Sequence, residues 1–246
     1  MGYKRAKAEP LNCPFKPSQH CGRCDCRKRC FFNFLSGDSL NRFRLERRMR
    51  RWRARQVVFH EDEPPQGIFI LCAGEAKISK SDRLGRELTL QHLSHGDLFG
   101  EVSFLAGDPY CGSAVTLQES VVCFLPRALV EHLRAAEPEF SRKLLSRVSR
   151  SLCRTMERAV GFAFQSAEGR LASFVLRLAL PGEAGAPPCR LSPQHTRRQI
   201  AENLGLSPET VIRALSSFQT RGLVRLVGKT IEILDRTGLE SLADRR

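Results

Sequence analysis

Residues 196–224, TRRQIAENLGLSPETVIRALSSFQTRGLV, contain two short helical patterns separated by Gly205, and few folds accommodate this arrangement. Glycine allows the sharp turn between the two helices. Ser207 is in position to cap the second helix, and Pro208 follows at the first helical position, where the missing N–H costs nothing. Apolar residues recur on one face of each helix, at Ile200, Ala201, Leu204, Val211, Leu215 and Phe218. The pattern predicts a helix-turn-helix, which places its second helix in the major groove of DNA.

The outer face of the second helix carries side chains that can contact base edges. Arg213 can donate two hydrogen bonds to guanine, Glu209 can accept one from cytosine, and Ile212 can touch a thymine methyl group. An exposed Glu–Arg pair is also common on ordinary helices. Arginines flank the motif at positions 197, 198, 221 and 225, however, where DNA phosphates need cations. We therefore predict DNA contacts at Arg197, Ser207, Glu209, Thr210, Ile212 and Arg213.

The charge of the chain also favours a polyanionic partner. Forty Lys and Arg residues against 26 Asp and Glu give a formal net charge of +14, and cations that neutralise phosphates release condensed counterions. No stretch approaches the roughly 20 apolar residues that span a bilayer, and the N-terminus lacks the apolar core of a secretory signal. We therefore expect a soluble cytoplasmic protein that binds nucleic acid and no membrane. No nucleophile paired with a base is recognisable, so we do not expect an enzyme.

In the rest of the chain, the spacing of apolar residues changes once, from that of short strands to that of a long helix. Short strand patterns separated by turn signals run from about Val57 to Pro126 and predict an antiparallel barrel or jelly roll. A long helical pattern follows, with arginines opposite an apolar seam. A second copy of the chain is the simplest partner for this seam, although packing on the chain's own barrel is an alternative. The predicted seam consists of Leu145, Val148, Leu152, Thr155 and Ala159.

Four of the ten cysteines fall within the eleven residues 20–30, HCGRCDCRKRC. In a reducing compartment, clustered cysteines bind metals or sense redox state more often than they form structural disulfides. Zinc and an iron–sulfur cluster both accept thiolate ligands. The spacing by itself leaves these two groups and a thiol–disulfide switch open.

The order of barrel, long helix and winged helix-turn-helix resembles the CRP/FNR superfamily of bacterial transcription regulators over nearly the whole chain. The most specific matches are GDLFGEVSFLAG, AEGRLASF, LGLSPETVIRALSSFQTRGLV and GKTIEI. The resemblance implies an α+β fold and a homodimer that contacts RNA polymerase and binds a palindromic double-stranded DNA operator through Glu209 and Arg213. It implies a cysteine-rich segment (1–34), a cyclic-nucleotide-binding-like antiparallel β-barrel or jelly roll (35–126), a long dimerisation helix (127–165) and a winged helix-turn-helix (166–246).

Cyclic nucleotide is not expected as the effector. Members of the superfamily that bind it keep a Gly-Glu pair and then an Arg-Ser-Ala triplet, whose arginine holds the phosphate. This chain has Gly100-Glu101 but continues with Gly112-Ser113-Ala114. A buried phosphate would therefore lack its main counter-charge, and Glu101 is expected to serve only the structure of the turn.

The cysteines match the FNR branch of the superfamily. FNR-type oxygen sensors hold a [4Fe-4S] cluster with three cysteines spaced C-x2-C-x5-C and a fourth in the barrel. Cys21, Cys24 and Cys30 have this spacing, and Cys123 in ESVVCFLP matches the distant ligand. The resemblance implies one cluster per monomer and DNA binding without oxygen; zinc, a thiol–disulfide switch and a small-molecule effector in the barrel remain as alternatives. The four isolated cysteines, Cys72, Cys111, Cys153 and Cys189, are expected to be small buried apolar residues.

Overall fold

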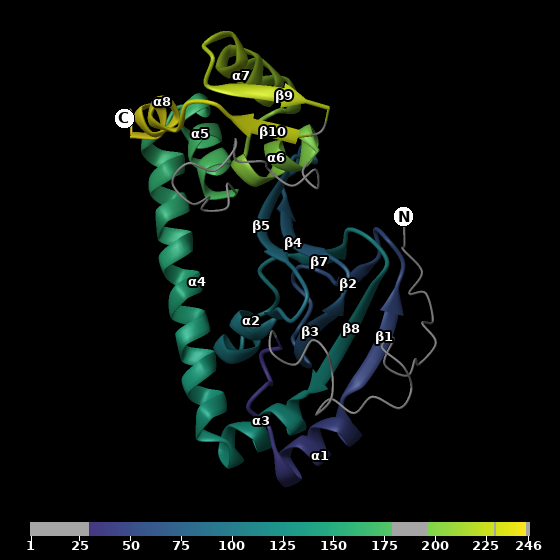
Figure 1. Cartoon of the computed structure of the whole chain (residues 1–246). Coiled ribbons are helices and arrows are strands. Elements are labelled where there is room, and N and C mark those ends of the chain that lie inside the picture. Colours follow the sequence, from purple (N-terminus) through teal and green to yellow (C-terminus); the bar gives the residue numbers. More distant parts are fainter. Residues whose placement is uncertain (1–29, 179–195, 229, 245–246) are drawn as a thin grey trace. The chain divides into compact units, whose positions relative to one another are not determined.

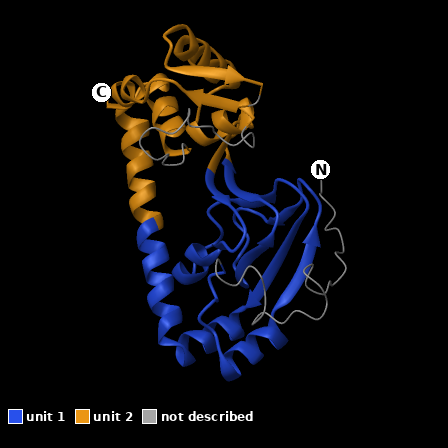
Figure 2. Ribbon diagram, viewed as in Figure 1, with its two compact units in different colours: residues 1–80, 90–150 blue, residues 81–89, 151–246 orange. Residues whose placement is uncertain are grey.

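The structure, a computed structural model, describes residues 30–178, 196–228 and 230–244 (Figure 1). The chain folds into two compact units, residues 1–80 with 90–150 and residues 81–89 with 151–246 (Figure 2). The expected α+β architecture is confirmed. In the described part of the chain, no helix is long and apolar enough to cross a membrane.

The expected barrel is a sandwich of two four-stranded sheets, ordered β1-β8-β3-β6 and β2-β7-β4-β5. Between them lies an aromatic and aliphatic core that includes Phe59, Phe99 and Tyr110. Because side chains alternate along a strand, β8 directs Val122 into this core and Cys123 to the opposite face. The strands are β1 (Arg48–Trp52), β2 (Val57–Phe59), β3 (Gly67–Ala73), β4 (Ala76–Ser81), β5 (Glu87–Leu93), β6 (Leu98–Phe99), β7 (Ser113–Thr116) and β8 (Ser120–Pro126).

The outer face of the first sheet is covered by helices. A second apolar core joins Ile70 and Cys123 of this sheet to Phe43, Leu133 and Phe140 of three helices. These helices are α1 (Gly37–Glu46), α3 (Arg127–Ala136) and the start of α4 (Pro138–Phe164), while the short α2 (Glu101–Ala106) follows β6. Cys123 therefore lies in an apolar environment between sheet and helices.

Two segments differ from the sequence-based expectation. The region 127–165 forms α3 and α4, because Glu137 is extended (φ −124°, ψ 95°) ahead of Pro138, where the proline ring disfavours helical backbone. The arginine-rich stretch 44–55 lies before about Val57, where the predicted strands begin, yet it also contains a strand. Residues Arg48–Trp52 are an edge strand paired with β8, so pairing with the sheet overrides the local charge pattern.

The second unit contains the predicted winged helix-turn-helix. Its core includes Val211, Leu215 and Phe218 from the second helix of the motif. Thr196 and Gln199 form a capping box at the start of the first helix, and Gly205 ends that helix with φ +60°. The elements are α5 (Ala167–Leu178), α6 (Arg197–Leu204), α7 (Pro208–Thr220), β9 (Val224–Val227), β10 (Thr230–Ile233) and α8 (Arg236–Asp244).

Candidate functional site

Helix α7 and its N-cap carry the side chains that the sequence predicted as DNA contacts, except Arg197, which begins α6. The Ser207 hydroxyl accepts a hydrogen bond from the backbone N–H of Thr210 at 3.2 Å and so caps the helix. With the inner face packed into the core, Glu209, Ile212 and Arg213 are exposed. Ile212 is 51% exposed, so its side chain is accessible to a partner surface.

Glu209 is held in its ionised form. Its own backbone N–H at the start of the helix lowers the pKa of its carboxyl, and Ser207 and the charge of Arg213 act in the same direction. An ionised carboxylate is only an acceptor. Glu209 therefore suits an amino group in the major groove.

Three of the four flanking arginines are already paired with acids. Arg198 contacts Glu202 at 3.0 Å, Arg221 contacts Glu168 at 3.3 Å, and Arg225 contacts Glu232 at 3.7 Å, so their charges are partly neutralised.

Arg197 is different, because it has no acidic partner within the described residues. Partial burial lowers the pKa of its guanidinium, but arginine remains protonated at neutral pH. Arg197 is thus the flanking cation best able to hold a phosphate.

The structure places two of the four predicted thiol ligands in one apolar core. Cys123 is fully buried on β8, and Cys30 packs against the same core from the segment before α1. Phe31, Phe32 and Phe34 follow Cys30, and the rings of the first two pack against Phe140 of α4. Cys21 and Cys24 lie outside the described residues. Residues 30–178, 196–228 and 230–244 contain no group of three His, Cys, Asp or Glu side chains that could hold a metal.

Cys72 is a neighbour of Cys123 that sequence reasoning missed. Its thiol is hydrogen-bonded to Cys123, and this contact, followed by burial, raises the pKa of Cys72 well above the ordinary value, while the charge of Arg47 opposes the rise. Cys72 packs against the apolar core as expected, but Cys123 lies beside it. The expectation of a small buried apolar residue is wrong for Cys111 and Cys153, which are exposed, and Cys189 lies outside the described residues.

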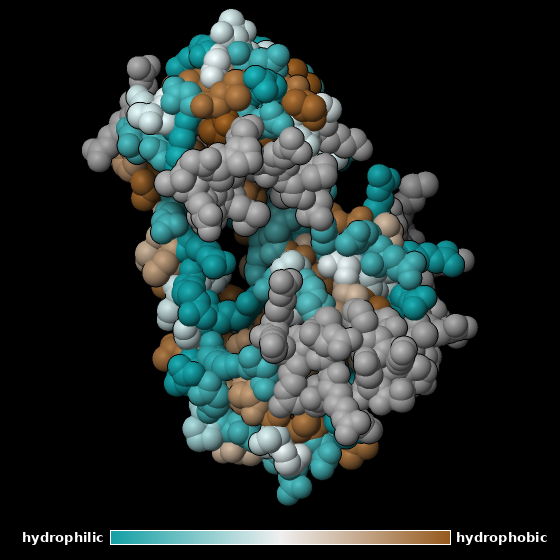
Figure 3. All heavy atoms as spheres, in the orientation of Figure 1, coloured by the Kyte–Doolittle hydropathy of each residue, from teal (hydrophilic) through white to brown (hydrophobic). Residues whose placement is uncertain are grey.

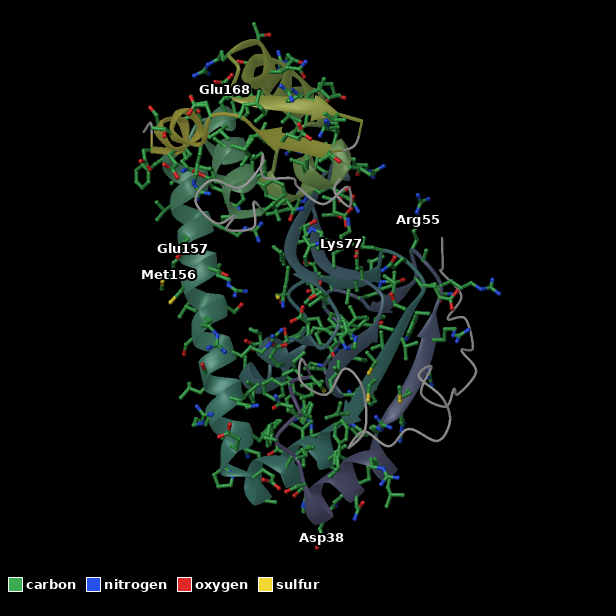
Figure 4. All side chains as sticks on the ribbon, viewed as in Figure 1. Asp38, Arg55, Lys77, Met156, Glu157 and Glu168 are labelled. Atoms are coloured by element: carbon green, nitrogen blue, oxygen red, sulfur yellow. The ribbon has the colours of Figure 1, made fainter. Side chains whose placement is uncertain are left out.

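The predicted seam on α4 is solvent-exposed in the single chain. Leu145 is 70% and Leu152 54% exposed, Thr155 and Ala159 are exposed, and Val148 is half-buried. Met156 and Val160, each 57% exposed, continue the same apolar face. Figure 4 shows Met156 projecting from α4 into solvent, and Figure 3 shows apolar patches along this helix.

Thr155 fits an apolar seam in spite of its hydroxyl. The Thr155 Oγ1 donates to the carbonyl oxygen of Ser151 at 2.9 Å, one turn earlier in α4. A partner helix would therefore meet the methyl group without leaving the hydroxyl unsatisfied.

Comparison with known proteins identifies the family. Residues 49–137 match the cyclic nucleotide-binding domain, and residues 169–242 match the Crp-like helix-turn-helix domain. A CRP-like cAMP-activated global transcriptional regulator of Mycobacterium tuberculosis is 35% identical over 182 residues, 73% of this chain and 80% of its own. The chain belongs to the CRP/FNR superfamily of DNA-binding transcription regulators.

Other members of this superfamily match over a greater length. The transcriptional activator protein anr of Pseudomonas aeruginosa is 27% identical over 241 residues, covering 96% of this chain and 97% of its own. The structure of FixK2 from Bradyrhizobium japonicum has a TM-score of 0.68 at 25% identity and covers 80% of this chain and 98% of its own. The match to anr leaves 4% of this chain uncovered. Because this uncovered part is shorter than the segment that precedes Cys21, the match includes Cys21.

In this CRP/FNR regulator the Gly-Glu position of the cyclic nucleotide binders is occupied by an internal ion pair. Glu101 is buried, and its Oε1 accepts a hydrogen bond from Arg147 Nε of α4 at 2.9 Å. Arg147 also donates to the carbonyl oxygen of Leu98. Burial raises the pKa of Glu101, and the Arg147 charge opposes this rise. Glu101 therefore does more than shape the turn, because it links α2 to α4.

Gly112 stands where the cyclic-nucleotide binders have the arginine of their Arg-Ser-Ala triplet, and the atoms around it leave no room for a long side chain. A Cβ atom on Gly112 would lie 2.9 Å from the backbone oxygen of Ser79 and 3.1 Å from Leu90. The backbone oxygen cannot move away as a flexible side chain can. The loss of the phosphate-binding arginine is thus accompanied by close packing around Gly112.

Proposed function

We propose that this CRP/FNR regulator is of the FNR type and senses oxygen through one [4Fe-4S] cluster per monomer, held by Cys21, Cys24, Cys30 and Cys123. The observation that carries the proposal is the presence of Cys30 and Cys123, far apart in sequence, in one apolar core. The nearly full-length match to anr, which takes in the cysteine-rich segment, supports it.

The residues around the two thiols suit such a group. The apolar side chains of this core limit access of water, and the solvation around a cluster sets its stability and potential. When bound, the cluster supplies iron sites that oxygen can oxidise. With the cluster bound, Cys30 and Cys123 join the segment before α1 to strand β8. When the cluster is lost, this link is lost with it.

The DNA-bound form is proposed to be a homodimer formed without oxygen. The exposed seam on α4 pairs with its copy, and each α7 contacts one half of a palindromic operator through Glu209, Ile212 and Arg213, beside RNA polymerase. The proposed segments are 1–34 for the cluster, 35–126 for the sensory barrel, 127–165 for dimerisation and 166–246 for DNA.

Cyclic nucleotide is a weaker candidate effector for this chain, although the Mycobacterium tuberculosis relative is named as cAMP-activated. Glu101 is neutralised by Arg147 at 2.9 Å, and Gly112 offers no cation for a phosphate. Zinc remains the main alternative metal, but structural zinc sites usually take their four ligands from two C-x2-4-C pairs, and Cys123 has no such partner in β8.

Metal analysis of protein purified without oxygen tests the proposal. We expect iron and sulfide near four each per monomer and a broad absorbance near ~400 nm. The Cys123→Ser variant should lose both, whereas the matched control Cys153→Ser, at an exposed thiol, should keep both. A colourless, zinc-loaded protein, or a Cys123→Ser variant with full iron, overturns the proposal.

A further inference from the structure

Three sulfur side chains lie on the helix-covered face of the first sheet, on three neighbouring strands. The strand order β1-β8-β3 places Cys123 on the middle strand. Met49 of β1 is the direct cross-strand partner of Cys123, and such partners project to the same side of a sheet. Cys72 of β3 contacts Cys123 through its thiol. All three side chains belong to one apolar core, so soft sulfur atoms are gathered around Cys123.

A bulge in β3 lies at Cys72. The cross-strand partner of Cys123 on β3 is Ile70, so in a regular ladder Cys72 would be only a diagonal neighbour, roughly 7–8 Å away. The register shifts between Leu71 and Ala73, which makes Cys72 the extra residue of the bulge. Bulges re-aim side chains, and here the Cys72 thiol is within hydrogen-bonding reach of Cys123. The two thiols are therefore close enough to share one ion.

The side chains around this thiol pair favour a soft metal ion. Within residues 30–178, 196–228 and 230–244, no His, Asp, Glu or further Cys completes a group of three with the two thiols. Zinc sites take four ligands, or three and a water molecule, which this apolar core does not offer. Thiolate and thioether sulfur are the ligands that select Cu(I). The pair of thiols beside the Met49 thioether therefore matches Cu(I) better than zinc.

Access and charge also suit a monovalent ion. Cys123 is fully buried, but Cys72 is partly exposed and gives an ion a route from solvent. Two thiolates around Cu(I) leave one negative charge on the site. The positive charge of Arg47 acts on the Cys72 thiol, so this arginine partly offsets that charge.

We propose that Cys72 and Cys123 bind one Cu(I) ion between their thiolates, with the Met49 thioether as the adjacent soft side chain. Thiols bind metals in their deprotonated form. On binding, two S–H bonds break, two Cu–S bonds form and both protons pass to solvent, and copper stays in the Cu(I) state throughout.

The copper site shares Cys123 with the cluster proposed above, but it does not need the cluster. Its second ligand, Cys72, is not one of the four proposed cluster ligands. Because one thiolate cannot serve both groups in full, Cu(I) at Cys123 should oppose cluster assembly. This consequence rests on the proposed function, whereas the copper site itself rests only on the contact between the two thiols.

Anaerobic titration of the metal-free, reduced full-length protein with Cu(I) tests the site. The chain has ten cysteines, so the coloured chelator bicinchoninate is kept in an excess that removes copper from single thiols. Under these conditions Cys72→Ser should bind one copper ion fewer per chain than the wild type. Cys153→Ser, the matched change at an exposed thiol, should bind as much copper as the wild type.

Alkylation of the wild-type protein gives a second measurement that needs no variant. A thiolate bound to copper is not free to react, so copper loading should slow iodoacetamide labelling of Cys72 at least about tenfold and leave Cys153 unchanged, as followed by peptide mass spectrometry. The proposal is overturned by equal copper content in Cys72→Ser and the wild type, or by an unchanged labelling rate at Cys72. Iron and sulfide, measured in separate reconstituted samples without copper, report on the cluster proposal alone.

Discussion

Arg147 of α4 donates from its Nε to the buried Oε1 of Glu101 at 2.9 Å, and this contact links α2 to the long helix. Removal of one partner from a buried ion pair leaves an uncompensated charge. Arg147→Ala should therefore lower the free energy of unfolding by about 3–5 kcal/mol. Urea titration measures it, with Arg142→Ala, which removes an exposed pair with Glu139, as a control that changes little.

The Arg147→Ala penalty should depend on pH. The pKa of Glu101 is raised by burial above its ordinary value of 4.5, and Arg147 limits the rise. A raised carboxyl pKa means that stability is lost as the pH rises through the window between the unfolded and folded values. Without Arg147 this window widens, so the variant should be nearer to the wild type at pH 4.5 than at pH 7.5. An equal penalty at both values would contradict an ionised Glu101 as the partner.

Gly112 should not tolerate even a methyl group. Its Cβ would meet the Ser79 backbone oxygen at 2.9 Å, and overpacking typically costs about 1–3 kcal/mol. Gly112→Ala should lower stability by this amount in urea unfolding. In Gly161→Ala, the new Cβ meets the flexible Gln165 side chain, and stability should be unchanged or higher.

The local chemistry of the helix-turn-helix is what made it predictable. Gly205, Ser207 and Pro208 each act on their own backbone or on a residue three positions away, and the structure gives the turn and cap that they predict. The order of the predicted strands, the long helical region and the winged helix-turn-helix follows in the same way from the spacing of apolar residues. Roles that depend on neighbours in sequence can be inferred without a structure.

Contacts between distant segments could not be inferred. The Cys72 thiol meets Cys123 because β3 pairs with β8 in one register and carries a bulge between Leu71 and Ala73. Neither the pairing nor the bulge has a sequence signal in this chain. Strand β1 was missed for the same reason, since its arginines gain their conformation from pairing with β8.

The α4 seam should control self-association. Leu152 is 54% exposed in the single chain. A symmetric dimer would bury this leucine in both chains. Leu152→Glu should weaken the dimer by about 100-fold or more, since each buried leucine contributes about 1.5–3 kcal/mol. Sedimentation velocity without oxygen measures it. Leu45→Glu, the same change at an 85% exposed leucine of α1, should leave association unchanged.

Arg213 and Arg197 should affect DNA binding in different ways. Arg213→Ala removes the proposed base contact, so it should cost about 1–3 kcal/mol and relax preference at one operator position. Arg197→Ala removes the proposed phosphate contact, so affinity should fall for all sequences and the slope of log K against log salt should decrease by about 1.

Anisotropy titrations of operator variants at several salt concentrations separate these effects. Arg198→Ala is the control for Arg197→Ala, because its charge is shared with Glu202 at 3.0 Å. A change in salt slope as large for Arg198 as for Arg197 would contradict the assignment.

The thiols should differ in reactivity in the order set by their surroundings. The thiolate is the reactive form, and the hydrogen bond to Cys123 together with burial raises the pKa of Cys72. Cys111 and Cys153 are exposed. In metal-free reduced protein at pH 8, iodoacetamide should therefore label Cys111 and Cys153 well before Cys72, as followed by peptide mass spectrometry. In Cys123→Ala the hydrogen bond is absent, so labelling of Cys72 should become faster, and an unchanged rate would show that burial alone protects it.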